Sequence, residues 1–600
     1  MIVALTGGLR TSIYGVRLTI TSGTRLFLWA IVVASIRHWF YPRHPVLRRF
    51  GPVQNDVDGF FARSSDQVTW TVPVVGLAGI LLTILMTWPQ TARLDAVPDI
   101  GDPVMSAWRL AWVNHQIVRD PFHLFDANIF FPERRTLAFT DSTIIPDLMA
   151  APLLWTGVNP ITAYNVVFLS SFLLSFFFTF LFVRRLVGDS AAAAVAAVIF
   201  GFYPFRFEHY AHFELQMSFW IPLALWAFHR TLELGRLADG VLTGLAIAAQ
   251  TLSSMYYGLF FVTYLIPVTL VVWKIRRPPA RAWGSLTVGA VLALVIIMPV
   301  AWPYFLNRSV LGERQFSEVS FYSATLTDYF SSHTRSLTWG WLPIRKLPER
   351  QLFPGIATIV LAIVGLWPPF SILRLAYASG LAVALDISLG FNGMLYNSLY
   401  TYVVPYRGLR VPARVSILVG FTLALFAAWG VRRLLSHVRS RRSSALFTAV
   451  LVTIILLESV PSLRLESIWR MPPAAYGAME PGAVVAEFPT PSDDTIAWYD
   501  TRYMYFSTFH WRRLLNGTSG FLPASYHEFV DRMLQFPNPD SLAYLKSRGV
   551  NYVVVHGAFL EPDRYARIRA TLDARSDISL ALRFTWEGRE GSVYRVSSAR

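Results

Sequence analysis

The chain has 600 residues, of which 54% are hydrophobic and only 15% are charged, whereas soluble proteins are about 25% charged. Its mean hydropathy is +0.43, and the apolar residues form long runs, so we expect a polytopic α-helical membrane protein. Cysteine is absent, which excludes disulfides, thiolate metal sites and a cysteine nucleophile.

The formal net charge of +16 has two interpretations, nucleic-acid binding or an orientation signal for membrane insertion. The basic residues gather in short loops such as Arg184-Arg185, Lys274 to Arg277 and Arg439 to Arg442. This placement follows the positive-inside rule. No basic and aromatic stripe of the kind that binds nucleic acid is present, so we expect membrane lipids and no nucleic acid as partners.

Residues 1–67 are predicted to be an N-terminal cytoplasmic or interfacial segment. The apolar run Leu26 to Ile36 has arginines at both flanks and is much shorter than the roughly 20 residues of a membrane span. We therefore expect an interfacial helix on the cytoplasmic face.

Residues 68–462 are predicted to form a transmembrane domain of about 11 helices. Hydropathy places the spans near 68–88, 163–183, 190–206, 215–230, 237–254, 257–273, 284–304, 353–369, 371–388, 413–433 and 443–461. The arginine-rich loops fall on alternate connections, which predicts a cytoplasmic N-terminus and an extracytoplasmic C-terminus.

Two outer segments are large. The first outer loop, 89–162, contains an amphipathic stretch at Val104 to Ile117 and an apolar patch at Ile144 to Trp155, which we expect along the membrane surface. Residues 463–600 are predicted to form an extracytoplasmic α/β domain. The expected strands are 484–488, 551–556, 580–585 and 592–596, and the expected helices are 525–534, 541–548 and 562–574.

Three carboxylates follow the first full span, at Asp95, Asp99 and Asp102. A carboxylate at the boundary between water and lipid can act as a general base or hold a divalent cation against a phosphate. The alternative is that these are solvated acids in a turn rich in Pro and Gly.

The short connection after the third span contains His209, His212 and Glu214. Such a set suits a metal, a phosphate or a sugar, although a polar helix end meeting water would have the same composition. Tyr257, beside a later outer end, could line a sugar pocket or belong to an interfacial tyrosine belt.

Arg410 and Arg414 lie near the outer end of a span, against the positive-inside bias. Guanidinium groups there suit a phosphate or pyrophosphate, or they reach lipid phosphates. Arg314 and Glu318 are four residues apart and either add a similar contact or pair with each other. In the C-terminal segment, the run from His510 to Arg513 and the glycine-rich turn after Asn516 suit a carbohydrate or are plain turns.

The layout resembles the GT-C superfamily of integral-membrane glycosyltransferases. The resemblance lies in a long first outer loop with Asp just after the first full span, in many further spans, and in an outer domain that closes the chain. It implies a bacterial inner-membrane enzyme that transfers a hexosyl or pentosyl group from a polyprenyl-phosphate donor to a glycan, lipid or protein acceptor. It also implies Asp102 as the catalytic base with Asp99 as its partner, and both as ligands of Mg²⁺ or Mn²⁺ if a metal is used.

Two other functions are compatible with the sequence. One is a transporter or flippase for a lipid-linked saccharide, which should carry charged residues near mid-span. The other is a non-catalytic scaffold of cell-envelope assembly, with the C-terminal domain as its binding module.

Overall fold

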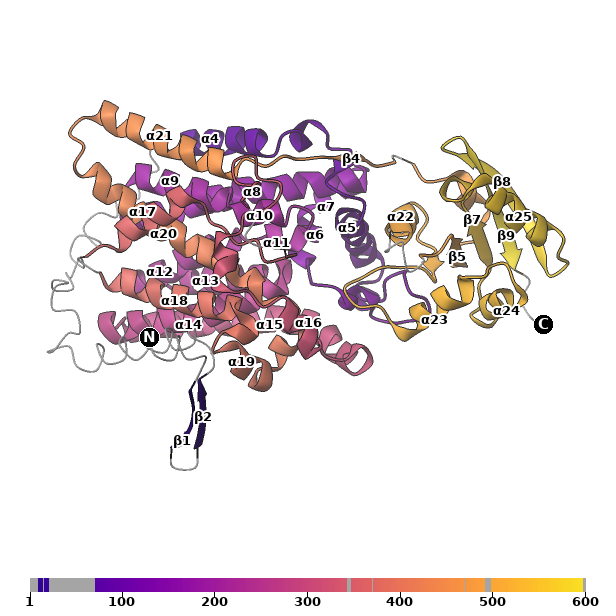
Figure 1. The fold of residues 1–600 in the computed structure, drawn as a ribbon, viewed down its shortest axis with the longest axis horizontal. Helices are drawn as coiled ribbons and strands as arrows, with labels where there is room; N and C mark the ends of the chain where they lie inside the picture. The colour runs from indigo at the N-terminus through magenta and orange to yellow at the C-terminus, as the bar shows by residue number, and fades with distance from the viewer. Residues whose placement is uncertain are drawn as a thin grey trace.

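The computed structural model describes residues 9–13, 16–20, 71–342, 347–368, 371–469, 471–491 and 498–596. The interfacial helix predicted at 26–36 lies outside these residues. A short antiparallel pair, β1 (Leu9–Ile13) and β2 (Val16–Ile20), lies near the N-terminus. The remainder forms a helical bundle and a C-terminal α/β region, at the left and right of Figure 1.

Each predicted span overlaps a helix of the bundle. The long helices are α4 (Thr71–Met86), α8 (Pro160–Val187), α9 (Ser190–Gly201), α12 (Trp220–Leu234), α13 (Leu237–Ser253), α14 (Met255–Arg276), α15 (Ala280–Leu311), α17 (Ile356–Leu366), α18 (Ile372–Ser388), α20 (Ser416–Leu435) and α21 (Arg441–Ser459). Within the described residues, six helices are long and apolar enough to cross a membrane by length and composition. The number of about 11 spans therefore stays a prediction.

Helix α20 lies at the centre of the bundle. In its most apolar stretch 94% is buried inside the protein, compared with 17% in α15 and in α21. Small residues allow the closest helix pairs. Gly240 and Gly244 of α13 are four residues apart and lie against Gly289 of α15, where a Cβ on Gly244 would collide with the backbone. This close approach is typical of helix pairs packed within a membrane.

Further helices connect those of the bundle. They are α5 (Asp102–Arg119), α6 (Ile144–Met149), α7 (Ala151–Trp155), α10 (Pro204–Glu208), α11 (Phe213–Gln216), α16 (Phe316–Phe321) and α19 (Tyr396–Tyr402). Helix α5 confirms the amphipathic stretch predicted in the first outer loop, and α6 and α7 form its apolar patch.

The C-terminal region contains a five-stranded sheet of order β6-β5-β7-β9-β8, in which β6, β5 and β7 are parallel and β9 and β8 are antiparallel additions. Its main elements are β5 (Val484–Phe488), α22 (Trp498–Ser507), β6 (Arg513–Leu514), α23 (Ala524–Met533), α24 (Pro539–Ser547), β7 (Tyr552–Val555), α25 (Pro562–Asp573), β8 (Ile578–Trp586) and β9 (Arg589–Val596). The four predicted strands and three predicted helices are present, and β6 and α22 were not predicted.

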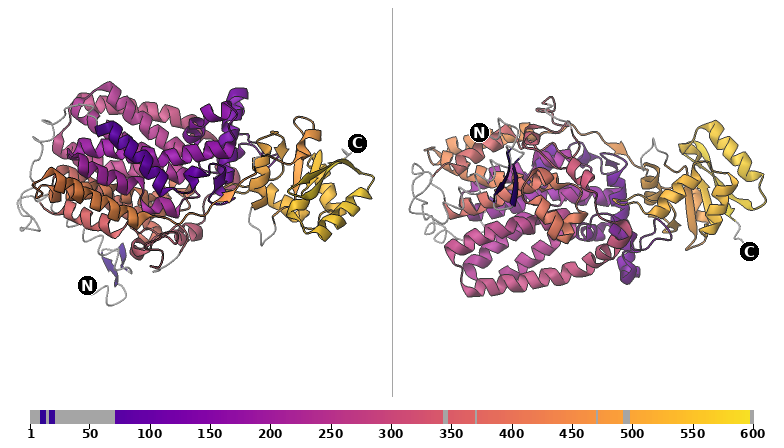
Figure 2. Two further views of the ribbon diagram at one scale, coloured as in Figure 1. Left: turned by 90° about the horizontal axis from the view of Figure 1, so that it is seen from above. Right: turned by 60° about the horizontal axis from the view of Figure 1, so that its bottom comes forward.

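The C-terminal region and the segment between α4 and α8 share one hydrophobic core. Trp108 and Trp112 of α5 belong to the same buried cluster as Val484 and Phe488 of β5. The backbones also pair, since the Phe131 N–H donates to the Leu514 carbonyl at 2.9 Å. A further two-residue ladder joins β3 (Ala96–Val97) to β4 (Glu466–Ser467). Helix α5 thus lies between the bundle and the C-terminal region (Figure 1), and both views in Figure 2 show these two parts side by side.

Candidate functional site

Helix α5 carries Asp102 at its first position, with a proline next to it that suits a helix start. The carboxylate therefore lies at the positive end of an 18-residue helix. Its side chain is 50% exposed, yet the surrounding protein desolvates it and raises its pKa, against the opposing effect of His212. The carboxylate of Asp99 accepts a hydrogen bond from the Gly101 N–H at 2.9 Å and braces the loop that precedes α5.

Two imidazoles come from the connection between α10 and α11, and that of His212 faces Asp102. The Nε2 atom of His212 lies 3.4 Å from the Asp102 carboxylate and 3.9 Å from that of Glu349. The Nδ1 atom of His209 lies 3.5 Å from the other Glu349 oxygen. The amide of Gln216 fixes this connection by donating to the carbonyls of Arg206 and His209. Burial lowers the pKa of His209 to about 3 despite the nearby Glu349, so its ring is neutral at pH 7.

Glu349 joins these groups to Arg414, and the sequence did not single it out. The guanidinium of Arg414 donates to both Glu349 oxygens, at 2.9 and 2.5 Å, and both side chains are buried. Burial opposes the negative charge, but Arg414 and His209 outweigh burial and hold the pKa of Glu349 well below its usual range. Its backbone has a φ of +64°, a left-handed conformation that non-glycine residues rarely adopt and that clusters at functional sites.

The segment around Glu349 is fixed by side chains that point to different partners. Arg350 forms an ion pair with Asp328 at 2.7 Å, and the Gln351 side chain accepts from the Thr334 N–H at 3.1 Å. Three consecutive polar residues are therefore buried, each with its own partner. A run of Glu-Arg-Gln in a polar loop gives no periodic signal of such burial, which is why the sequence did not reveal it.

A second group of charges surrounds Tyr256. Its hydroxyl accepts from the Arg410 N–H at 2.8 Å, and the Arg414 guanidinium lies 4.9 Å from its ring centre. The carboxylate of Glu318 lies 3.6 Å from Arg314 and 3.9 Å from Arg410, with both arginines partly exposed. Arg410 also lies over the ring of Tyr322. Arg414 thus belongs to both groups and links Asp102, through His212 and Glu349, to the open arginines.

The remaining predicted residues have different surroundings. Glu214 lies 3.7 Å from Arg414, at the edge of the same group. Tyr257 is fully buried and its hydroxyl donates to the Leu215 carbonyl at 3.0 Å, which supports α11. Asp141 was not predicted; it accepts from the Met255 N–H at 2.9 Å, and burial together with Glu214 raises its pKa to about 6. The substrate-binding roles assigned from the sequence stay predictions.

One set of side chains has the geometry for a metal ion. Ligand atoms of His209, His212 and Glu349 lie within 4.8 Å of one another. Asp99 and Asp102, the predicted ligands, are not in this set. Two imidazoles and a carboxylate suit Mn²⁺ better than Mg²⁺, which prefers oxygen ligands. Arg414 already binds both oxygens of Glu349, so a cation would share that carboxylate with a guanidinium.

Comparison with solved structures shows proteins with a similar fold. Two cryo-EM structures of the arabinofuranosyltransferase AftD from Mycobacteria, both of the mutant R1389S, have TM-scores of 0.57 and 0.56 at 13% and 14% identity. Each match covers 88% of this chain but only 41% of AftD. The apo oligosaccharyltransferase of Archaeoglobus fulgidus has a TM-score of 0.44 at 13% identity, covering 83% of this chain and 71% of its own. The two matches to AftD show that this chain has a similar fold, although it spans less than half of the length of AftD.

The family follows from the sequence match. Residues 77–379 match the family model described as "Domain of unknown function (DUF6311)". This match covers about half of the chain, so the protein belongs to that family. The search of curated proteins found no match.

Proposed function

We propose that this protein is a membrane glycosyltransferase that moves a sugar from a polyprenyl-phosphate donor to an extracytoplasmic acceptor, in a bacterial inner membrane. The observation that supports it best is the connected group Asp102–His212–Glu349–Arg414 at one end of a GT-C-like bundle. An open carboxylate lies at one side of this group, and partly exposed arginines lie at the other.

Asp102 is the proposed general base. It accepts the proton of the acceptor hydroxyl while the acceptor oxygen attacks the anomeric carbon of the donor sugar. The bond from that carbon to the phosphate oxygen breaks, and the lipid phosphate leaves with the electron pair. Direct displacement inverts the configuration at the anomeric carbon. The raised pKa of Asp102 favours this role, because a base is most effective when its pKa lies near the working pH.

Arg410 and Arg314 are the proposed ligands of the donor phosphate. Both are partly exposed, and among the described residues they share the carboxylate of Glu318, at distances of 3.6 and 3.9 Å. A guanidinium in such a position can stabilise the negative charge that develops on the leaving phosphate. Arg414 instead holds Glu349, which keeps a negative charge behind His209 and His212. We assign Arg414 and Glu349 to positioning these imidazoles.

If the enzyme uses a divalent cation, the residues proposed to hold it are His209, His212 and Glu349. When bound, such a cation would supply positive charge to the phosphate. The roles given to Asp102, Arg410 and Arg314 do not depend on it.

The test is sugar transfer by purified protein with polyprenyl-phosphate pentoses and hexoses as donors. Asp102→Asn keeps the size of the side chain and removes the base, and we expect a fall of about 10²- to 10⁴-fold in turnover. Asp120→Asn is the matched control, because Asp120 follows the other end of α5 and pairs with exposed His123. Equal turnover in the two variants would remove the proposed base. Donor transport without any glycoside product would favour the transporter alternative.

A further inference from the structure

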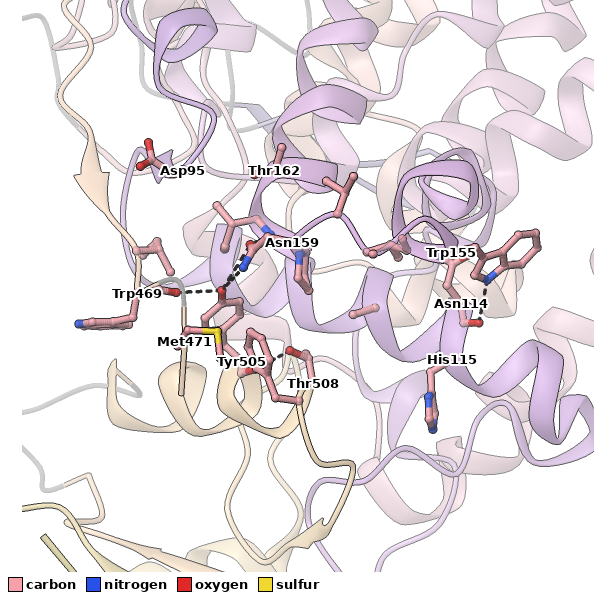
Figure 3. Close-up of a pocket in the computed structure, with 18 of the residues that line it drawn as sticks. Asp95, Asn114, His115, Trp155, Asn159, Thr162, Trp469, Met471, Tyr505 and Thr508 are labelled. Atoms are coloured by element: carbon pink, nitrogen blue, oxygen red, sulfur yellow. Dashed lines mark hydrogen bonds between the residues drawn. The ribbon is translucent and has the colours of Figure 1, made fainter. Parts of the chain in front are cut away.

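A second site lies where the first outer loop meets the C-terminal region. It is a cavity of about 660 Å³, within the range of about 300–1,000 Å³ that is usual for small-molecule sites. One side is formed by Asn114 and His115 of α5 and by Trp155 of α7. The opposite side is formed by Trp469 and by Tyr505 of α22, as Figure 3 shows. Asp102 and the residues around it do not line this cavity.

The walls are held in place by hydrogen bonds between these elements. The amide of Asn159, at the start of α8, donates to the Tyr505 hydroxyl at 2.9 Å. That hydroxyl donates in turn to the Trp469 carbonyl at 2.9 Å. The bundle and the C-terminal region are thereby fixed to each other at the cavity (Figure 3), which makes it a preformed site.

The described lining of the cavity carries little charge. Its described lining residues include no lysine or arginine, and the acidic one is Asp95. Burial and the nearby Arg119 lower the pKa of His115 to about 4, so its ring is neutral at pH 7. This ring stacks on Trp511, with 4.1 Å between the ring centres. Among the described lining residues, a phosphate would therefore find no guanidinium or ammonium group, in contrast to the surroundings of Arg410.

The polar groups of the cavity instead require a ligand with hydroxyls. Asn114 is only 3% exposed, and its amide nitrogen donates to the Leu110 and Asp147 carbonyls. Its side-chain oxygen is buried and has no hydrogen-bond partner among the described residues. A buried acceptor without a donor is costly, and a ligand hydroxyl would satisfy it. Thr162 and Thr508 add further hydroxyls to the lining.

Large aromatic faces complete the site. Trp155 is 62% exposed and Phe509 is also exposed, although both line the cavity. A sugar ring presents apolar C–H faces between its hydroxyls, so it can lie against an aromatic ring while its hydroxyls bind amides. The aromatic faces and the buried acceptor, in a described lining without lysine or arginine, suit a neutral saccharide better than a lipid or a phosphorylated ligand.

We propose that this cavity binds a neutral saccharide and, given the proposed function, that it holds a distal part of the acceptor glycan. The segment from Asp95 to Asp102 connects the two sites. Seven residues span at most about 25 Å, so an extended glycan held beside Asp95 can reach the reacting end near Asp102. Binding remote from the reaction centre would then orient the acceptor hydroxyl.

The experiment measures saccharide binding without any donor, by saturation-transfer NMR on the full-length protein in detergent. The probes are a linear arabinofuranose hexasaccharide and maltohexaose. We expect saturable binding of one of them that Trp155→Ala weakens by about tenfold or more. Trp367→Ala is the matched control, because Trp367 is also 62% exposed but lies at the end of α17, away from the cavity.

The proposal is overturned if neither saccharide binds saturably, or if Trp155→Ala and Trp367→Ala weaken binding equally. It is also overturned if a short-chain phosphatidylcholine occupies the site, with Trp155→Ala as the sensitive variant, and the saccharides do not compete. Because no transfer is measured, a failure of the proposed glycosyltransferase activity would leave this result unchanged, and the two proposals can fail separately.

Discussion

Helix α5 and the segment before α17 each bring one carboxylate to His212, and the surroundings of these two carboxylates shift their pKa values in opposite directions. Asp102 is half exposed at a helix start, and its pKa is raised by desolvation. Glu349 is buried against Arg414, and its pKa is held low. The same chemical group is thus a proton acceptor with an adjustable charge in one region and a fixed charge in the other. Environment, and not residue type, divides reactive from supporting acids.

Arg410 and Arg414 also differ from each other in burial. Arg414 is buried and bound to both oxygens of Glu349. Arg410, four residues earlier, is partly exposed and lies 3.9 Å from Glu318. Only the second has a guanidinium that a ligand can reach without breaking a buried ion pair, so the predicted phosphate role suits Arg410 better than Arg414.

The variant Arg414→Ala is expected to have the largest effect on stability. It leaves Glu349 buried without its partner, and breaking a buried ion pair costs about 3–5 kcal/mol of stability. Thermal unfolding of the purified protein measures the effect. The double variant with Glu349→Ala should recover part of the loss, because no charge is then left unpaired. A single variant as stable as the wild type would contradict the supporting role.

Asp500 of α22 can be compared with Glu349, because it is also a buried acid but has no arginine partner among its described contacts. It accepts from Asn516 and Tyr526, and burial raises its pKa to about 7. The folded protein therefore keeps a proton that the unfolded chain releases above about pH 4. Stability should fall as the pH rises from about 4 to about 7, by at most about 4 kcal/mol.

In the variant Asp500→Asn the side chain is neutral at every pH, so this contribution to the pH dependence of stability should disappear. Melting temperatures of both proteins across that pH range measure the difference. Parallel curves for the variant and the wild type would show that Asp500 is ionised in the folded protein.

Arg410→Ala is expected to have the smallest effect on stability. Its ion pair with Glu318 is partly exposed and long, and such pairs contribute about 0–1 kcal/mol. The same thermal unfolding assay measures it beside Arg414→Ala. A loss as large as that of Arg414→Ala would mean that the two arginines have the same structural role.

The sequence predicted the bundle because hydropathy alone locates long apolar helices. Alternating strands in the C-terminal segment were predicted on the same grounds. The shared core of Trp108 and Val484 was not, because periodicity shows which face of an element is buried but not what covers it. Helix α22 has no clear apolar stripe in its sequence, which explains why it was missed.

For the candidate site, the sequence could predict which connections between helices carry its residues, but not how these residues contact one another. Alternating arginine loops placed Asp102, His212 and Arg414 at one end of the bundle, and the structure brings them within one connected group. Glu349 could not be predicted, because its position depends on a left-handed backbone and on partners far away in the sequence. Arg410 and Arg414 differ in burial, and their positions in the sequence do not show which of the two is buried.

The most direct measurement is the steady-state kinetics of Asp102→Asn and Arg410→Ala with one polyprenyl-phosphate donor. We predict that Asp102→Asn lowers kcat with little change in the donor KM, because the base acts in the chemical step. We predict that Arg410→Ala raises the donor KM by about 10- to 100-fold, the usual value of a charged hydrogen bond. If Asp102→Asn changes only KM, or if Arg410→Ala binds the donor as the wild type does, the proposed division between base and phosphate ligand is wrong.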